Sequence, residues 1–344
     1  MQVLPRLLIT TIIGLALAAI PASANDMKPG KGTTLKPGRA TWNTGFFQEA
    51  LVRHGLEELG YKVKTPKDLQ NPIFYQSVAL GDLDYWTNGW FPMHYGQMPK
   101  NFSDDADMYG YVIKAGGLQG YLVSKRDVEK YNIKTLDDFK REEVKKAFDS
   151  NGDGKADLIA CPPGWGCEKI ISHQMKAYDL EDHVNQIKAS YEAGMASGLG
   201  EYKSGKPIFF FTWAPNWTIF KLKPGKDVMW IGVPEIIPNE SQKGLEDLMT
   251  VSGIEGAVSD PLQIGWVTSD IRIVANKKFI AKNPAAKKFF EVFTLPLADI
   301  NEQNTRMYEG EKSQKDITRH VEEWISKNQD TWNGWLDAAR KAAK

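Results

Sequence analysis

Apolar residues along this chain recur alternately at helical and at strand-like spacing. They follow helical spacing over residues 46–59, and Gly60 comes next as a stop signal, which predicts a helix ending there. Residues 61–63 then have the character of a short strand. A second short helix is predicted over 73–80, and a strand over 82–86 leads into an aromatic loop.

The same alternation continues toward the C-terminus. Further strands are predicted at 121–123, 208–211 and 271–275, and further helices at 136–148, 167–178 and 285–293. The run at 208–211 is continuously apolar, which is typical of a strand buried on both faces. Helices that alternate with short strands predict an α/β fold, and the chain ends in amphipathic helices that contain tryptophan.

The first residues have the pattern of a secretory leader. Arg6 is followed by an apolar run over 7–20 and by the small residues 22–24, which predicts a signal peptide over residues 1–24 and cleavage before Asn25. The apolar run is short for a membrane span and polar residues follow it at once. This favours cleavage over the alternative of an uncleaved N-terminal anchor.

Chain length, net charge and the absence of catalytic motifs limit the class of protein that this sequence can encode. The chain has 344 residues, more than the roughly 250–300 at which a single core stops growing, so two lobes are expected. Its 43 basic and 43 acidic residues cancel, so no basic field attracts nucleic acid or anionic lipid. Common catalytic motifs are absent, and the phosphate-loop-like segment 200–206 is followed by Pro207 where a magnesium-binding Ser or Thr belongs. We therefore expect a binding protein and not an enzyme.

Two cysteines, Cys161 and Cys167, lie close together in a Pro/Gly-rich turn. In an exported chain this spacing favours a disulfide, which stabilises by about 2–2.5 kcal/mol on the chain-entropy model and rigidifies the backbone around Trp165. A zinc site is the competing interpretation, but two thiols lack the further ligands that zinc needs.

Five of the 11 tryptophans occur in short segments that contain Gly, Pro or Asn: Trp86, Trp90, Trp165, Trp213 and Trp217. A tryptophan in such a segment has less reason to be a core residue, although ordinary packing stays the alternative for any single one. A quaternary ammonium group has no N–H to donate. Electron-rich indole faces instead attract its charge and bury its methyl groups, at about 0.5–2 kcal/mol for each face. Together the five favour an aromatic cage.

The negative end of such a ligand needs hydrogen-bond donors. Gly166 and Cys167 begin a predicted helix, so they supply backbone N–H groups and the positive end of a helix dipole. His94, four residues after Trp90, adds a side-chain N–H, although a lone histidine is more often structural or solvated. A site without a buried Arg or Lys suits a zwitterion of no net charge.

An Asp/Asn-rich loop over residues 149–157 matches the first part of an EF-hand calcium loop, with Gly154 at the turn position but Ala160 in place of the final Glu. Its candidate calcium ligands are Asp149, Asn151, Asp153, Lys155 and Asp157. The alternative is a polar turn closed by Asx-type hydrogen bonds. Apart from a structural calcium ion at this loop, no cofactor is expected.

Several short motifs together carry a family resemblance. The most specific is Cys161-x-Pro-Gly-Trp-Gly-Cys-Glu168. The others are Trp90-x-Pro-x-His94, Phe148-Asp-x-Asn-Gly-Asp-Gly-Lys-Ala-Asp-Leu158, Gly205-Lys-Pro207, Thr212-Trp-x-Pro-x-Trp217, Lys223-Pro-Gly-Lys-Asp227 and Val274-Ala-Asn-Lys277. With them, the chain resembles the ProX-type glycine betaine-binding components of osmoregulatory ABC importers over nearly its whole mature length. It departs from that pattern over 82–89, where Trp86 adds an indole, and over 236–267.

The resemblance implies a type II periplasmic-binding-protein fold, with two α/β lobes joined by a two-strand hinge. Residues 25–118 plus 262–344 would form lobe one, and residues 119–261 lobe two. It implies a cage and a carboxylate site made of Trp90, Trp165, Trp213, His94, Gly166 and Cys167. Trp86 and Trp217 are additional ligand-binding candidates.

The function expected from the resemblance is capture of glycine betaine, or a related quaternary-ammonium solute, in the periplasm. The protein would deliver this ligand to a membrane permease whose ATPase lies in another chain. It is expected to act as a monomer and to bind no nucleic acid. The alternative is a sensory subunit that presents the same ligand to a membrane receptor.

Overall fold

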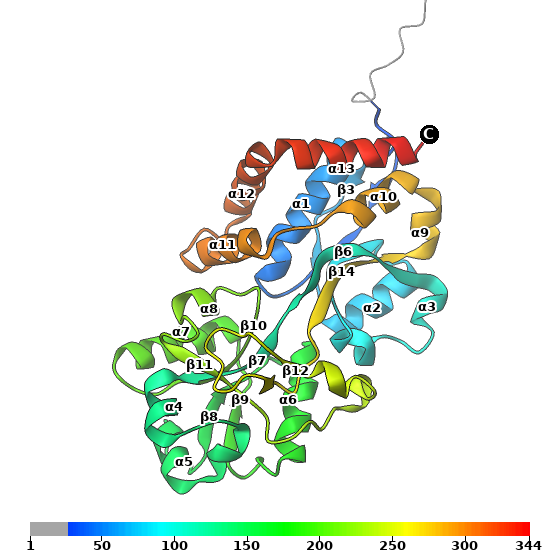
Figure 1. Cartoon of the computed structure of the whole chain (residues 1–344). Coiled ribbons are helices and arrows are strands. Elements are labelled where there is room, and N and C mark those ends of the chain that lie inside the picture. The colour runs from blue at the N-terminus through cyan, green and yellow to red at the C-terminus, as the bar shows by residue number, and fades with distance from the viewer. Residues whose placement is uncertain (1–26) are drawn as a thin grey trace, which may run out of the picture.

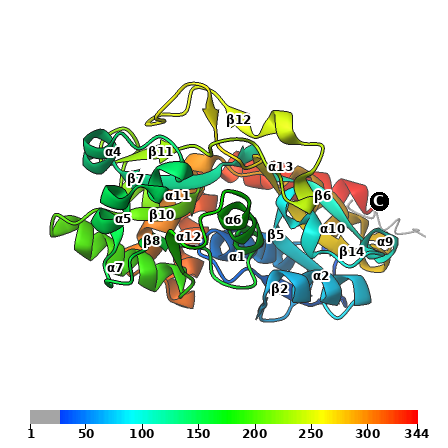
Figure 2. The ribbon, with the colours of Figure 1, turned by 90° about the horizontal axis from the view of Figure 1, so that it is seen from below.

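The computed structural model describes residues 27–344 and consists of two α/β lobes, each built on a five-stranded sheet (Figure 1). We refer to the lobe that contains both ends of the described chain as lobe one and to the other as lobe two. The signal peptide predicted at residues 1–24 lies outside the described residues. Seen from below, helix α6 (Gly166–Ala177) of lobe two lies at the junction of the lobes (Figure 2).

The sheet of lobe one combines strands from distant parts of the sequence. Its order is β4 (Lys67–Asp68), β2 (Pro37–Arg39), β5 (Tyr85–Phe91), β14 (Ser269–Asn276) and β6 (Ala106–Gly117). β2 is parallel to β4 and β5, whereas β14 is antiparallel to both β5 and β6. A strand from the last third of the sequence therefore lies inside the sheet that the N-terminal part begins.

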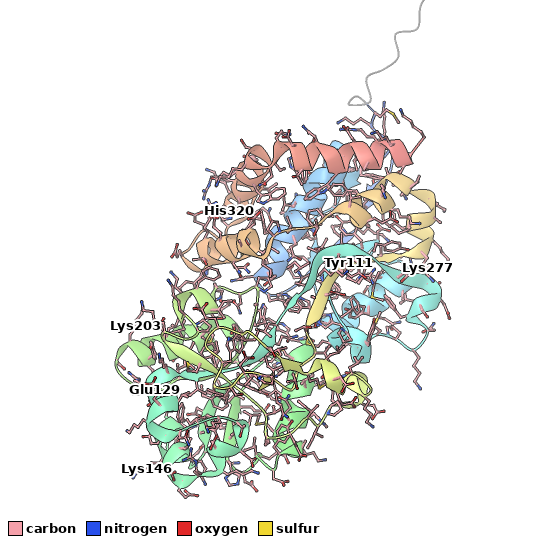
Figure 3. The ribbon with its side chains drawn as sticks, in the orientation of Figure 1. Tyr111, Glu129, Lys146, Lys203, Lys277 and His320 are labelled. Carbon is pink, nitrogen blue, oxygen red and sulfur yellow. A yellow bond between two sulfur atoms is a disulfide. The ribbon has the colours of Figure 1, made fainter. Side chains whose placement is uncertain are left out.

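The sheet of lobe two is contributed by the middle of the chain. Its order is β11 (Val228–Ile231), β7 (Gln119–Ser124), β10 (Phe209–Trp213), β8 (Ala156–Ile159) and β9 (Val184–Ile187). β10 is buried along its whole length, as its continuous apolar run predicts. Charged residues such as Glu129, Lys146 and Lys203 lie exposed on the outer surface of this lobe (Figure 3).

Two segments connect the lobes. Only Leu118 separates β6 of lobe one from β7 of lobe two, and the chain returns to lobe one at β14. This is the predicted two-lobed fold with a two-strand hinge. The lobe boundaries at 118/119 and 261/262 stay predictions.

The remaining elements surround the two sheets. In the N-terminal part they are β1 (Thr34–Leu35), α1 (Thr44–Glu58), β3 (Lys62–Val63), α2 (Asn71–Leu80), η2 (Met93–Gln97) and α3 (Phe102–Asp105). The middle part adds α4 (Lys125–Tyr131), η3 (Leu136–Lys140), α5 (Glu142–Phe148), α7 (Tyr191–Lys203), α8 (Thr218–Lys221), η4 (Glu240–Gln242), η5 (Glu246–Leu248), β12 (Thr250–Val251) and β13 (Leu262–Gln263). The C-terminal part adds α9 (Lys277–Lys282), α10 (Pro284–Val292), α11 (Leu297–Tyr308), α12 (Gln314–Lys327) and α13 (Gln329–Ala342).

Two local predictions were wrong. The helix expected over 136–148 is split, because Arg141 has an extended backbone between η3 and α5 and a capping box starts η3 at Thr135. The aromatic loop expected after residue 86 is instead the continuation of β5 to Phe91, since pairing with β14 makes it an interior strand. Within residues 27–344, no helix combines the length and the apolar character needed to span a bilayer.

We expect Gly55→Ala to destabilise lobe one. Gly55 lies in α1 where a Cβ would come 2.2 Å from Cζ of Phe289 in α10, and overpacking of this kind costs about 1–3 kcal/mol. The matched control is Gly334→Ala in the exposed part of α13, where no atom lies within 4 Å of an added Cβ. This substitution should stabilise by about 0.5–1 kcal/mol through helix propensity. Denaturant unfolding measures both changes, and equal free energies of unfolding for the two variants would contradict the packing argument.

Candidate functional site

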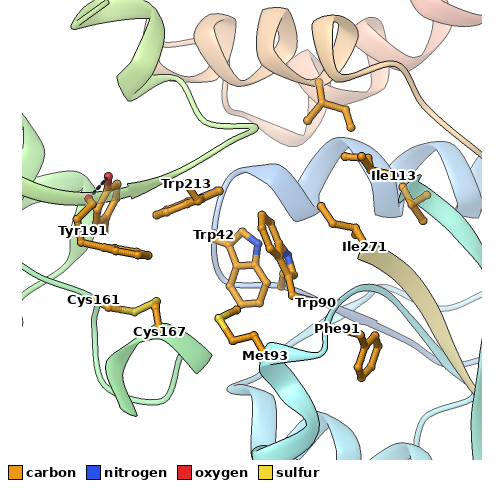
Figure 4. Close-up of a cluster of buried hydrophobic side chains, with 14 of the residues drawn as sticks. Trp42, Trp90, Phe91, Met93, Ile113, Cys161, Cys167, Tyr191, Trp213 and Ile271 are labelled. Carbon is orange, nitrogen blue, oxygen red and sulfur yellow. Dashed lines mark hydrogen bonds between the residues drawn. A yellow bond between two sulfur atoms is a disulfide. The ribbon is translucent and has the colours of Figure 1, made fainter. Parts of the chain in front are cut away.

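A small cavity lies between the lobes. It is lined by Trp42, Asn71, Trp90, Met93, His94, Gln119, Trp165, Gly166, Cys167, Phe211 and Trp213. In Figure 4, Trp42, Trp90 and Met93 face Trp213 and the Cys161–Cys167 disulfide across the space between the lobes. Residues from both halves of the molecule therefore share one enclosure.

All six residues nominated from the sequence as ligand-binding line this cavity. On lobe one, Trp90 lies near the end of β5 and His94 in η2. On lobe two, Trp165, Gly166 and Cys167 form the start of α6, and Trp213 ends β10.

The indoles meet at steep angles. The ring centroids of Trp42 and Trp165 are 5.3 Å apart with planes inclined by 64°, and those of Trp165 and Trp213 are 5.6 Å apart at 81°. Tyr191 lies 4.7 Å behind Trp213 and supports it. Rings inclined in this way form walls that face different directions around a common space.

One buried amide fixes the two indoles of lobe one. The side-chain oxygen of Asn88 accepts hydrogen bonds from Nε1 of Trp42 and Nε1 of Trp90, both at 2.8 Å. The Asn88 amide nitrogen donates to Oε1 of Gln48, and both amide residues are fully buried. Since β5 and β14 change register beside Asn88, a local irregularity of the strand aims this residue between the two indoles.

The two indoles of lobe two are held from the opposite lobe. Nε1 of Trp165 donates to Oγ1 of Thr41 at 3.0 Å, and Nε1 of Trp213 donates to Oγ1 of Thr44 at 3.3 Å. The Thr44 hydroxyl also donates to the carbonyl oxygen of Pro215 at 3.0 Å. Closure of the lobes therefore completes the hydrogen bonding of the cavity walls.

His94 is a neutral hydrogen-bond donor at this site. The backbone N–H of Trp90 donates to its Nδ1 at 3.1 Å, and the Tyr75 hydroxyl lies 2.7 Å from the same atom. Because Nδ1 accepts from Trp90, the single proton of the neutral ring is on Nε2, which lies 3.0 Å from the side-chain amide of Asn71. Complete burial lowers the pKa of His94 to about 3, since the charged form would lose its hydration.

The start of α6 lies against His94. Gly166 and Cys167 are the first residues of this helix, so their N–H groups have no intrahelical acceptor. A Cβ on Gly166 would lie 2.8 Å from Cδ2 of His94, so only glycine allows the imidazole this close to the helix end. The predicted disulfide is confirmed: Cys161 and Cys167 are bonded and tie the turn to the helix.

The two additional candidates lie outside the cavity lining. Trp86 is fully buried behind His94, stacked on Phe74 at 4.3 Å and parallel to the imidazole at 5.7 Å. Trp217 is fully buried elsewhere and stacks on Tyr308 at 3.9 Å. The structure therefore brings neither indole into the space that the other nominated residues enclose.

Sequence reasoning missed five lining residues: Trp42, Asn71, Met93, Gln119 and Phe211. Trp42 could have been found, because it lies in a short polar segment before a predicted helix, as the nominated tryptophans do. Gln119 pairs with Trp213 across the sheet, and its Nε2 is buried without a hydrogen-bond partner in the described part of the chain. Nothing in its sequence context distinguishes it from an ordinary strand residue.

The Asp/Asn-rich loop is closed by hydrogen bonds of its own. Asp149 accepts from the backbone N–H of Gly152, Asp153 and Gly154, and Asp157 accepts from Ser150 and Asn185. Across residues 27–344, no group of three or more His, Cys, Asp or Glu residues is placed to hold a metal ion. These bonds are those of the polar-turn alternative, and calcium binding stays a prediction.

Comparisons with known proteins identify the family. Residues 33–327 match the OpuAC family, described as the substrate binding domain of the ABC-type glycine betaine transport system. The glycine betaine-binding periplasmic protein OusX of Dickeya dadantii is 44% identical over 98% of each chain. The glycine betaine/proline betaine-binding periplasmic protein of Escherichia coli is 39% identical over 92% of this chain and 93% of its own.

A solved structure shares the fold. Lactococcal OpuAC, in a closed-liganded conformation complexed with glycine betaine, has a TM-score of 0.66 at 20% identity. The match covers 88% of this chain and 99% of that chain.

We expect the imidazole of His94 to stay neutral across the physiological range. Its folded-state pKa of about 3 lies below the unfolded value of about 6.5, so the unfolded chain binds the extra proton first. As pH falls from about 6.5 toward 3, His94 therefore lowers the free energy of unfolding by up to about 1.4 kcal/mol per pH unit. NMR should show no titration of the His94 ring between pH 8 and 5, with His94→Gln identifying the signal. A midpoint near 6.5 would refute the burial argument.

Proposed function

This chain belongs to the family of substrate-binding domains of ABC-type glycine betaine transport systems, and we propose that it captures glycine betaine or a closely related quaternary-ammonium solute in the periplasm. The family is one of binding proteins and not of enzymes. The closed protein would then deliver its ligand to a membrane permease driven by an ATPase in other chains. We propose that it works as a monomer.

The observation that carries the proposal is the convergence of Trp42 and Trp90 from lobe one with Trp165 and Trp213 from lobe two on one cavity. Indole faces attract a trimethylammonium group by about 0.5–2 kcal/mol each and bury its methyl groups. We propose that these four rings form the cage. Because each lobe holds only part of it, the ligand has its full set of contacts only in the closed protein.

The carboxylate end would be bound by N–H groups. The backbone N–H groups of Gly166 and Cys167 line the cavity beside Nε2–H of His94, which the ligand would share with the neighbouring Asn71 amide at 3.0 Å. They can accept no hydrogen bonds in return, which suits an oxyanion.

Charge supports the same ligand. No Lys, Arg, Asp or Glu is among the lining residues, and His94 is neutral. A net cation or a net anion in this buried space would lack a compensating charge, at a large desolvation cost. A zwitterion carries both charges itself, and the site provides a separate environment for each.

We expect Trp165→Ala to weaken glycine betaine binding about tenfold or more, because it removes one indole face together with its methyl contacts. Isothermal titration calorimetry measures the affinity. The control is Trp335→Phe in α13, which lies outside the cavity lining and should leave the affinity unchanged. Equal changes in glycine betaine affinity for the two variants would contradict the proposed cage.

Choline should bind at least about tenfold more weakly than glycine betaine. It keeps the trimethylammonium group but has no carboxylate, so the N–H groups of Gly166 and Cys167 would lose a charged acceptor that contributes about 1.5–3 kcal/mol. Competition calorimetry at constant pH makes the comparison. If choline bound as tightly as glycine betaine, the assignment of these donors to a carboxylate would be wrong.

A further inference from the structure

A second aromatic contact joins the lobes outside the ligand cavity. The Trp217 indole, at the start of α8 in lobe two, stacks on the Tyr308 ring at the end of α11 in lobe one. Their centroids are 3.9 Å apart and their planes differ by only 14°. In Figure 1, α8 and α11 face each other across the side of the molecule. Trp217 and Tyr308 are 91 positions apart in sequence and belong to different lobes, so their contact depends on how the lobes lie relative to each other.

Charged groups surround this stack. Nζ of Lys221 lies 2.5 Å from Oε1 of Glu309 and 5.6 Å from the Tyr308 ring centroid, and both contacts link α8 with the end of α11. Nε1 of Trp217 donates to Oε2 of Glu192 at 2.9 Å, which fixes the indole within lobe two. Trp217 is therefore held in lobe two by its hydrogen bond to Glu192. When the lobes open, Tyr308 moves away from it together with lobe one.

The two rings differ in solvent exposure, and both lie outside the ligand cavity. Trp217 has no exposed surface, whereas Tyr308 is only partly buried. Neither residue lines the ligand cavity. Opening the lobes would uncover one face of the Trp217 indole and break the Lys221–Glu309 ion pair. Substituting Tyr308 would weaken this contact without changing any residue that lines the cavity.

We propose that the stack of Trp217 on Tyr308 is a closure latch that sets ligand affinity from outside the cavity; this inference rests on the proposed function. Contacts made only in the closed form make the binding free energy more favourable for every ligand that closes the lobes. The latch therefore raises affinity uniformly, whereas the cage and the carboxylate donors distinguish one ligand from another. Tyr308 and Trp217 are positioning residues: they act on the ligand through the position of the lobes.

The experiment compares Tyr308→Ala with its matched control Tyr308→Phe. Tyr308→Ala removes the ring, and Tyr308→Phe keeps the stack and loses only the hydroxyl. Calorimetry with glycine betaine and with proline betaine gives the affinities. Small-angle X-ray scattering of the unliganded proteins gives the degree of opening.

We expect Tyr308→Ala to weaken both ligands by the same factor, about three- to tenfold, as the loss of one aromatic pair implies. Tyr308→Phe should stay within about twofold of the parent protein. The unliganded Tyr308→Ala protein should have a larger mean radius of gyration than the Tyr308→Phe protein. Because the surface ion pair contributes little, Glu309→Gln should change affinity less than about twofold.

Two results would overturn the latch. One is an unchanged affinity in Tyr308→Ala, and the other is a different factor for the two ligands, which would mean that Tyr308 acts through the cage. Failure of the proposed function is a separate outcome, seen as no betaine binding by the parent protein. The scattering comparison of the unliganded variants would then still decide whether the stack holds the lobes together.

Discussion

A trimethylammonium group has no N–H to donate, so no arrangement of hydrogen-bond acceptors can recognise it by direction. Only electron-rich surfaces on several sides can hold such a charge. The cavity between the lobes provides four indoles, and each of them has its ring nitrogen bonded: Trp42 and Trp90 to Asn88, Trp165 to Thr41, and Trp213 to Thr44. Satisfying these N–H groups in the wall leaves the ring faces free to form the proposed cage. Much of the surrounding polar structure serves this one requirement.

The proposed carboxylate site has the complementary requirement, which is hydrogen-bond donors. An oxyanion needs donors that stay donors at every relevant pH, and backbone N–H groups meet that condition. His94 joins them because burial keeps its ring neutral and because Trp90 occupies Nδ1, which leaves the proton on Nε2. Glycine at position 166 is the steric condition for this contact between helix and imidazole.

The sequence was sufficient for the two-lobed α/β fold and for nominating six residues that line one cavity. Local sequence context was enough for this, because Trp90, Trp165 and Trp213 each lie close to Gly or Pro residues and outside any amphipathic helical pattern. The same context could not separate them from Trp86 and Trp217, since which surface an indole faces depends on strands and helices far away in the chain. It could not reveal Asn88 or Thr44 either, because Asn88 joins Trp90 to Trp42, which lies 46 residues away, and Thr44 accepts from Trp213, which lies 169 residues away. The wrong predictions concern backbone that local patterns did not reveal: pairing with β14 extended β5 through an expected loop, and an extended backbone at Arg141 divided an expected helix.

The position of β14 inside the first sheet also bears on how the molecule assembles. Lobe two is formed by one continuous stretch of sequence, so its strands can pair as soon as that stretch is available. Lobe one has a gap between β5 and β6 until residues 269–276 arrive. Long-range pairing of this kind is slow because a large loop must close first. Synthesis from the N-terminus thus favours a lobe two that forms early and a lobe one whose interior strand β14 is the last to be inserted.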